Sequence, residues 1–113
     1  MTEQRRVVEI NPLAPVSITS LPLITSAIST VAVAIVTTVV LVATAARRYA
    51  CIVNTGPTWV YLAFAEPAVV GRGIPLAPNG LGSYEITLLN PFVGAVNAIA
   101  NGAASSVAVE EAT

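Results

Sequence analysis

Apolar and polar residues alternate along several short stretches of this chain. The clearest alternation is in Ser83–Leu89, where large apolar residues alternate with Ser, Glu and Thr. A period of two indicates a strand with one buried face. Turn residues separate such stretches at intervals of roughly 8–12 residues, which predicts an antiparallel sandwich or barrel. Further strands are expected at Val31–Ile35, Val39–Val42, Val93–Ala100 and Ser105–Glu110.

The stretch Arg47–Phe64 predicts two strands joined by a tight turn. Asn54–Pro57 carries the turn residues, because Asn and Gly tolerate left-handed conformations and Pro fixes φ. Before the turn, Ala50 and Ile52 share one face of the expected strand; after it, Trp59 and Tyr61 share a face. We therefore expect a β-hairpin at the centre of the fold, covered on both of its apolar faces.

The uncharged segment Leu21–Ala46 supports two interpretations. It is long enough to cross a membrane as a helix of about 20 residues, and Arg47 follows it on a positive flank. However, Val31–Ile35 alternates large and small residues, and two threonines separate it from Val39–Val42. Two strands fit this pattern better than one helix. The alternative is a small single-pass membrane protein with a helix at residues 21–46.

The N-terminal part predicts an extended arm. Pro12, Pro15 and Pro22 disfavour helix and lack backbone donors. We assign residues 1–30 to the arm and residues 31–113 to a β-sandwich domain. The fold class expected for the whole chain is all-β: a jelly-roll-like antiparallel sandwich with an extended N-terminal arm.

The arm is interpreted as a docking segment that lies on a neighbouring subunit. Arg5 and Arg6 are its positive charges, and Glu3 and Glu9 dilute them, which argues against a signal peptide. The arm residues expected at an interface are Arg5, Arg6, Pro12 and Pro15.

Charge is scarce in this sequence. Of the 113 residues, 55% are hydrophobic and 10% are charged, against about 25% charged in ordinary soluble domains. There is no Lys, Asp or His. A free monomer keeps a charged surface for solubility, so this chain should bury much of its surface against lipid or other subunits. Small domains are also marginally stable alone. We expect a homo-oligomer, a trimer, and no membrane partner.

The residue types argue against several classes of function. A net charge of −1 offers no basic footprint for nucleic acid. The absence of His removes most catalytic triads and the commonest zinc sites. Cys51 is the only cysteine and is expected to be a small buried residue. We therefore expect no enzymatic activity, and we assign no catalytic, cofactor-binding or metal-binding residue.

The charged residues of the sandwich are expected on its surface. Arg47 and Arg48 should be solvated at a strand start, or paired with Glu85 across a sheet. The other carboxylates are expected in a loop and at the C-terminus, where replacing Glu110 or Glu111 by Gln should cost little. Gly71–Gly73 lacks the following helix that a phosphate loop needs.

Trp59 and Tyr61 could form a stacking platform for sugars or bases. No basic residues surround them in the sequence, so packing in a core or a subunit interface fits better. These two residues complete the expected interface set. A carbohydrate- or ligand-binding β-sandwich remains an alternative class.

From Val39 onward the order of features resembles small β-sandwich virion proteins of tailed bacteriophages. The resemblance implies a structural role as a capsid decoration (cement) protein, a homotrimer on the outside of the shell, with the major capsid protein as partner. A small tail or fibre component is the alternative within the same group. No individual binding residue carries over. The matching segments are Val39–Ala43, Ala46–Arg48, Asn54–Gly56, Val60–Leu62, Gly73–Gly80 and Val107–Glu110.

Overall fold

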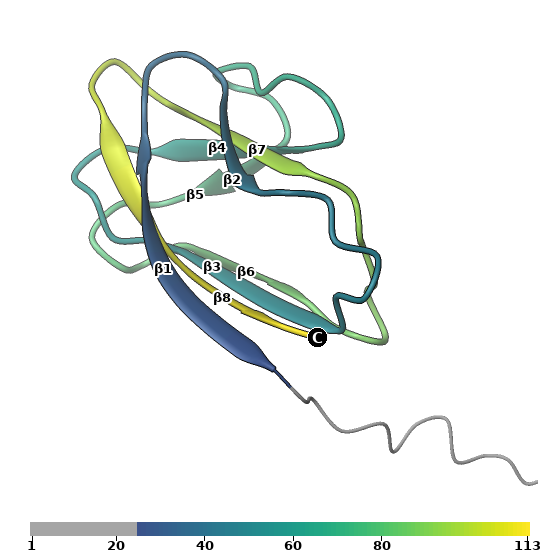
Figure 1. Ribbon diagram of the computed structural model, residues 1–113. Helices are drawn as coiled ribbons and strands as arrows, with labels where there is room; N and C mark the ends of the chain where they lie inside the picture. The colour runs from purple at the N-terminus through teal and green to yellow at the C-terminus, as the bar shows by residue number, and fades with distance from the viewer. Residues whose placement is uncertain (1–24) are drawn as a thin grey trace, which may run out of the picture.

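A computed structural model of the chain describes residues 25–113, which contain strands and no helix. Figure 1 shows the strands arranged in two layers. The strands are β1 (Ser26–Val33), β2 (Thr38–Leu41), β3 (Tyr49–Asn54), β4 (Val60–Phe64), β5 (Ile74–Leu76), β6 (Ser83–Ile86), β7 (Val96–Ala100) and β8 (Ser105–Ala112).

The eight strands form two four-stranded sheets. Sheet A has the order β1-β8-β3-β6 and sheet B the order β2-β7-β4-β5, and all neighbouring strands are antiparallel. The chain changes sheet at every connection except β4–β5. Eight strands in two packed sheets with this crossing order form a jelly roll. The expected all-β, jelly-roll-like antiparallel sandwich is confirmed.

The core fills the space between the sheets. In β3 the burial alternates strictly, with Ala50, Ile52 and Asn54 inside; in β4, Val60 and Leu62 are inside. The faces inferred from the sequence period are therefore confirmed. Both sheets contribute the largest fully buried apolar side chains, which are Ile52, Leu62, Leu76, Ile86, Val33, Val60, Val96 and Val107.

The expected central hairpin is wrong. β3 pairs with β8 and β6, whereas β4 pairs with β7 and β5. Asn54–Pro57 therefore leads the chain from one sheet to the other. Asn101 and Gly102 do the same between β7 and β8. The outward face of β3 is half-exposed, so only one face of this strand lies in the core.

The first strands correct two further expectations. Residues 25–46 contain β1 and β2, so the membrane helix expected in the alternative interpretation is wrong for this segment. In the part of the chain that the structure describes, no helix is long and apolar enough to cross a membrane. β1 begins at Ser26, inside the range assigned to the arm, because backbone pairing with β8 extends to Ala112.

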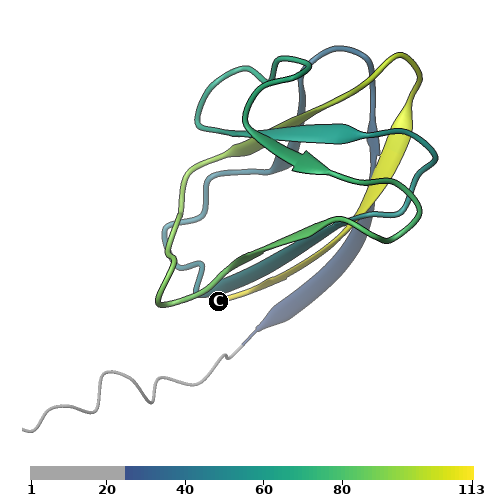
Figure 2. The ribbon, with the colours of Figure 1, turned by 180° about the vertical axis from the view of Figure 1, so that it is seen from behind.

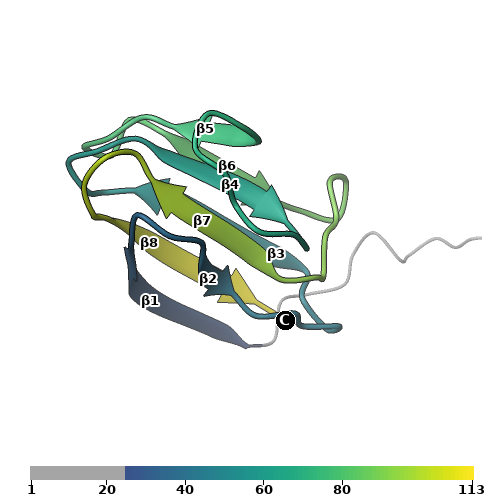
Figure 3. The same ribbon diagram turned by 90° about the horizontal axis from the view of Figure 1, so that it is seen from above.

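The connections gather at two ends of the sandwich, as Figures 1 and 3 show. Loops β1–β2, β3–β4, β5–β6 and β7–β8 lie at one end, which we call the Asn54 end. Loops β2–β3 and β6–β7 lie at the opposite end, which we call the Arg47 end. The N-terminus of β1 and the C-terminus of β8 also lie there.

The β4–β5 loop folds over the outer face of sheet B (Figure 2). Asn97 donates through Nδ2 to the carbonyl oxygen of Glu66 at 2.7 Å, and the backbone N–H of Ala68 donates to Thr37 Oγ1 at 2.9 Å. These bonds hold the loop across β7, and Ile99, which follows on the same outward side, is buried.

The strand expected at Ser83–Leu89 is shorter in the structure. β6 ends at Ile86 because Thr87 and Asn90 close a tight turn through their backbone groups, at 3.1 and 3.2 Å. Leu88 and Leu89 then lie in the β6–β7 loop. Leu89 is 98% exposed, so the apolar alternation continued beyond the strand into a solvent-facing loop.

Candidate functional site

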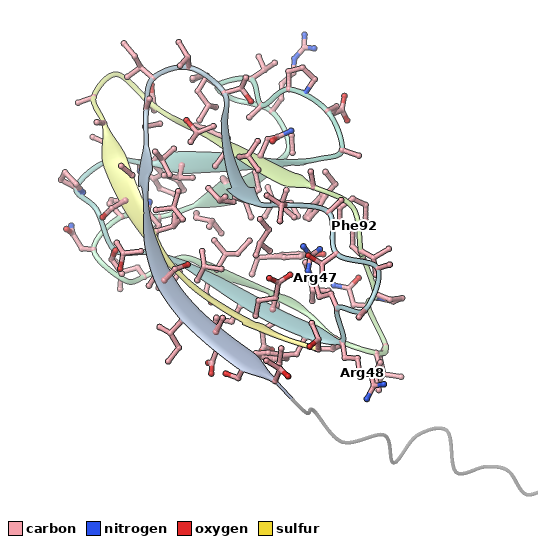
Figure 4. All side chains as sticks on the ribbon, in the orientation of Figure 1. Arg47, Arg48 and Phe92 are labelled. Carbon is pink, nitrogen blue, oxygen red and sulfur yellow. The ribbon has the colours of Figure 1, made fainter. Side chains whose placement is uncertain are left out.

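Arg47 holds the Arg47 end together from inside. Its side chain is fully buried, and Nε donates to Glu111 Oε2 at 2.6 Å. Nη1 donates to the carbonyl oxygens of Phe92 and Gly94, at 2.9 and 3.0 Å, and Nη2 to that of Val42 at 2.6 Å. Figure 4 shows the side chain inside the ring formed by these loops. One guanidinium thereby connects loop β2–β3, loop β6–β7 and strand β8.

This arrangement corrects the expectation for the Arg pair. Arg47 is buried and pairs with Glu111, not with Glu85. Glu111 faces inward because it continues the buried face of Val107 and Val109 along β8. Glu111 is therefore no free surface carboxylate. Figure 4 shows Arg48 on the outside of the same region.

Glu85 instead accepts a hydrogen bond from Tyr49. The Tyr49 hydroxyl donates to Glu85 Oε2 at 2.9 Å on the outer face of sheet A. That hydrogen bond, together with burial and the nearby Cys51 thiol, raises the pKa of Tyr49 to about 12. The phenol is kept protonated by this contact, which makes it a donor on the surface and not a base.

Asn54 performs the corresponding role at the other end, with a neutral group. Its Nδ2 donates to the carbonyl oxygens of Thr58 and Leu76, at 2.8 and 2.9 Å. Its Oδ1 accepts from the backbone N–H of Gly56 at 3.1 Å and from Ser105 Oγ at 2.9 Å. The side chain, fully buried, thus uses all of its hydrogen-bonding capacity.

Gly56 permits this close packing. A Cβ at Gly56 would collide with Ser105 Oγ and with the backbone nitrogen of Ser106. The backbone of Gly56 also donates to the Ser106 carbonyl at 3.1 Å. The Asn-Thr-Gly sequence, interpreted above as a hairpin turn, therefore binds loop β3–β4 to the start of β8.

In both polar clusters the central side chain is bonded mainly to backbone groups: three of the four bonds of Arg47 and three of the four bonds of Asn54 are of this kind. Fully satisfied buried networks rigidify a fold and fix its geometry. The two ends are therefore closed frames that hold their loops in place.

A hollow lies beside the β4–β5 loop, between this loop and the adjoining ends of β4 and β5. Its volume is about 240 Å³, below the roughly 300–1,000 Å³ of ordinary ligand sites. Phe64, Ile74 and Val69 line it, with Glu66 and Arg72 as its charged residues. No Ser, Thr, Cys or second carboxylate joins them, so this lining provides no nucleophile and no acid–base pair.

The remaining candidate chemistry is dispersed. Among residues 25–113 there is no group of three or more His, Cys, Asp or Glu residues that could hold a metal ion. Cys51 is half-buried on the outward face of β3, opposite Glu85 on one side and Glu110 on the other. This residue is more exposed than expected.

Large apolar side chains lie on the surface of this molecule instead. They occur on β1, on the outer strand positions and at both ends. Leu81 at the Asn54 end and Leu89 at the Arg47 end are the most exposed. The others are Ile28, Ile35, Val36, Val39, Val42, Trp59, Val69, Val70, Leu88 and Val93.

The expected interface residues fall into two groups. Trp59 and Tyr61 alternate with the buried Val60 and Leu62, so both lie on the outward side of sheet B, with Trp59 45% exposed. Tyr61 is half-buried between Pro75 on β5 and Ile99 on β7. The expected arm residues Arg5, Arg6, Pro12 and Pro15 lie outside the described residues.

Sequence reasoning missed most of the exposed apolar residues. Leu89 was placed in the strand expected at Ser83–Leu89, and Leu81 was assigned no role. Ile28 was placed in the arm, whereas it lies on β1 and is 79% exposed.

Fold and surface together define a class: a jelly-roll β-sandwich with closed ends, an apolar exterior and no gathered reactive groups among its described residues. Comparison of the chain with family models, with curated proteins and with solved structures finds no match.

Proposed function

We propose that this protein is a non-enzymatic virion structural protein that decorates the outside of a bacteriophage head as an oligomer. The observation that carries the proposal is the contrast between polar side chains bonded inside the sandwich and an apolar, charge-poor exterior. Buried polar groups are paired within the sandwich, whereas large aliphatic side chains are exposed at both ends. Charged residues make up only 10% of the chain, so its surface lacks the charges that keep a free monomer soluble, which supports contact with other protein.

The fold is compatible with this role but does not determine it. Jelly rolls occur in viral capsid and lectin domains, and one fold can host unrelated functions. The resemblance of the segments from Val39 onward to phage virion proteins supports the capsid branch. A homotrimer bound to the major capsid protein remains the expected assembly.

The test uses heads assembled from the major capsid protein encoded in the same genome. Full-length chain is mixed with these heads, and the heads are sedimented. We expect the chain to cosediment and to saturate at a fixed ratio to capsid subunits. If the chain binds purified tails and not heads, the tail-component alternative replaces the decoration role. Binding to neither particle refutes a virion role.

Two matched surface variants identify which end contacts the shell. Leu81→Ser changes the Asn54 end and Leu89→Ser the Arg47 end, and both side chains are almost fully exposed. Neither substitution should alter thermal stability, because surface changes usually cost less than about 0.5 kcal/mol. We expect one of them to weaken head binding at least tenfold. Equal binding by both variants would show that neither end is the contact.

The partial exposure of Trp59 favours one second candidate, a carbohydrate-binding sandwich. Aromatic side chains provide stacking surfaces for planar or apolar ligand faces. A glycan array probed with the full chain tests this directly. Glycan binding that Trp59→Ala abolishes in a protein with unchanged melting temperature would favour this candidate over head decoration.

A further inference from the structure

Four strands lie at the edges of the two sheets, and three of them are blocked against further pairing. β5 contains Pro75, which has no N–H to donate. β2 is four residues long and carries an irregularity in its register between Val39 and Leu41. Proline, short length and bulges are the devices by which proteins prevent edge-to-edge pairing.

The third blocked edge is β6. It is four residues long and carries Glu85 on its outward face. Asn90 folds back from the following turn, and its Nδ2 donates to the carbonyl oxygen of Glu85 at 3.2 Å. A charge and a side-chain cap therefore cover this edge.

The fourth edge, β1, has none of these features. It is eight residues long, contains no proline or charged residue, and pairs with β8 in unbroken register from Ser26 to Val33. Its first five residues are exposed, including Ile28 at 79%. A long, uncharged, regular edge is a template for another strand.

The backbone groups that face this free edge can be assigned. Thr25 and Thr113 exchange both backbone hydrogen bonds, at 3.2 and 2.8 Å. In an antiparallel ladder such pairs alternate with pairs that make no bond to each other. The N–H and C=O groups of Ser29 and Val31 are therefore directed toward β8, and those of Ile28 and Thr30 toward the open side.

We infer that β1 is an assembly edge, and that it pairs antiparallel with β1 of a second copy of this chain. The other described edges of a second copy are blocked, so its β1 is the edge that can accept this one. Two uncharged strands meet without electrostatic repulsion. An isologous pairing of this kind has twofold symmetry and joins two A sheets into one continuous sheet. It therefore links copies in pairs, and beside the proposed trimer it would connect a copy in one trimer to a copy in another.

The position of the remaining chain is compatible with this geometry. The 24 residues outside the described part join the fold at Thr25, one residue before β1. Antiparallel pairing places these two junctions at opposite ends of the shared ladder. Thr25 of each copy would then lie beside the start of the β1–β2 loop of the other copy.

The register is also restricted. Only residues whose backbone groups face the open side can exchange bonds, so even-numbered residues of one copy must face even-numbered residues of the other. An axis at Ser29 aligns Ser26 with Ala32, and an axis at Thr30 aligns Ala27 with Val33. Any other centre leaves more of the strand unpaired.

Amide hydrogen exchange on the full-length protein tests the inference residue by residue. Ser29 and Val31, bonded to β8, should be protected at all concentrations. Ile28 and Thr30 should be protected at high protein concentration and lose at least tenfold of that protection on dilution. Rapid exchange of Ile28 and Thr30 at every concentration overturns the inference. Protection that persists in a monomer also overturns it, because the chain's own N-terminal segment would then cover the edge.

A variant separates edge pairing from other contacts. Thr30→Pro removes one N–H on the open side and leaves the donors of the β1–β8 ladder in place, so the dimer dissociation constant should rise at least tenfold. The matched control, Thr30→Val, keeps the N–H and should associate as the wild type does. Unchanged association of a folded Thr30→Pro protein overturns the inference.

Cysteine crosslinking covers the case in which Thr30→Pro fails to fold. Ser29→Cys and Thr30→Cys are each made in a Cys51→Ser background and oxidised. One of them should give a disulfide-linked dimer, because one of these positions faces itself across the axis. Ala108→Cys, one strand in from the edge, should not. If neither β1 variant forms a disulfide-linked dimer, the proposed pairing is contradicted. The result is independent of head binding, so this inference and the proposed function can fail separately.

Discussion

At one end of the sandwich a buried guanidinium binds the surrounding loops, and at the other a buried amide does so. Arg47 makes four hydrogen bonds, one of them to the carboxylate of Glu111. Asn54 also makes four, all with neutral partners. The two clusters solve the same problem, which is to satisfy the polar backbone of several loops that converge on one place.

The two clusters differ in the free energy that is lost when a buried partner is removed. A charge buried without its partner is far more costly than an unpaired amide. Substitution of Arg47 should therefore lower the free energy of unfolding more than substitution of Asn54. In both clusters the buried polar side chain stabilises the fold, so we look for the functional surface among the exposed residues.

The largest effect is expected for Arg47→Met. It leaves the inward-facing Glu111 and three loop carbonyls without their partner, and breaking a buried ion pair costs about 3–5 kcal/mol. Denaturant unfolding measures the loss. The matched control is Arg72→Met in the exposed β4–β5 loop, which should change stability by less than about 0.5 kcal/mol. Equal losses at both arginines would mean that Arg47 is not buried as described.

The stability cost of truncating buried apolar residues between the two ends is the reference for the costs of the polar substitutions. Ile52→Ala and Leu62→Ala should each cost about 2–5 kcal/mol through loss of contacts and cavity formation, because both side chains are fully buried. Ile28→Ala and Leu81→Ala are controls of the same residue types at exposed positions. Losses below 1 kcal/mol at both buried positions would show that the core lies elsewhere.

Asn54→Ala should cost somewhat less, about 2–4 kcal/mol, because several buried partners lose their bonds at roughly 1–3 kcal/mol each. The control is Asn97→Ala, which removes a single bond to the Glu66 carbonyl at a half-exposed position. Thermal melts of the two variants compare them directly. A larger loss for Asn97→Ala than for Asn54→Ala would refute the role assigned to Asn54.

The smallest loss of stability is expected when the two adjacent carboxylates on β8 are replaced. Glu111→Gln keeps the shape but removes the charge paired with Arg47, so we expect a loss of about 1.5–3 kcal/mol. Glu110→Gln, exposed on the opposite face, should be neutral within about 0.5 kcal/mol. Urea midpoints at pH 7 measure both. A neutral Glu111→Gln would mean that hydrogen bonding alone, without charge, holds the Arg47 cluster.

These two neighbours also show how far the sequence could be interpreted. Alternation identified most strands and their inward faces, as in β3, because burial of one face imposes a period of two. It could not distinguish Arg47 from Arg48, or Glu111 from Glu110. The partners are 64 residues apart in the chain, and strand order alone brings them together.

The turn at Asn54 was misinterpreted for a similar reason. Asn-Thr-Gly-Pro permits a sharp change of direction, which suits a hairpin as well as a passage between two sheets. The deciding contacts are the bonds of Asn54 to Leu76 and Ser105, both far away in the sequence. Likewise, the open edge of β1 became visible only once β8 was known to be its partner.

The central claim is that the exposed apolar surface of this chain belongs to an assembly. Sedimentation velocity of the full-length protein at micromolar concentration, without detergent, tests it most directly. We predict a discrete oligomer that remains soluble, because exposed leucine, isoleucine and valine side chains become buried between copies. A stable monomer at that concentration, with the same fold and no tendency to associate, would contradict the account.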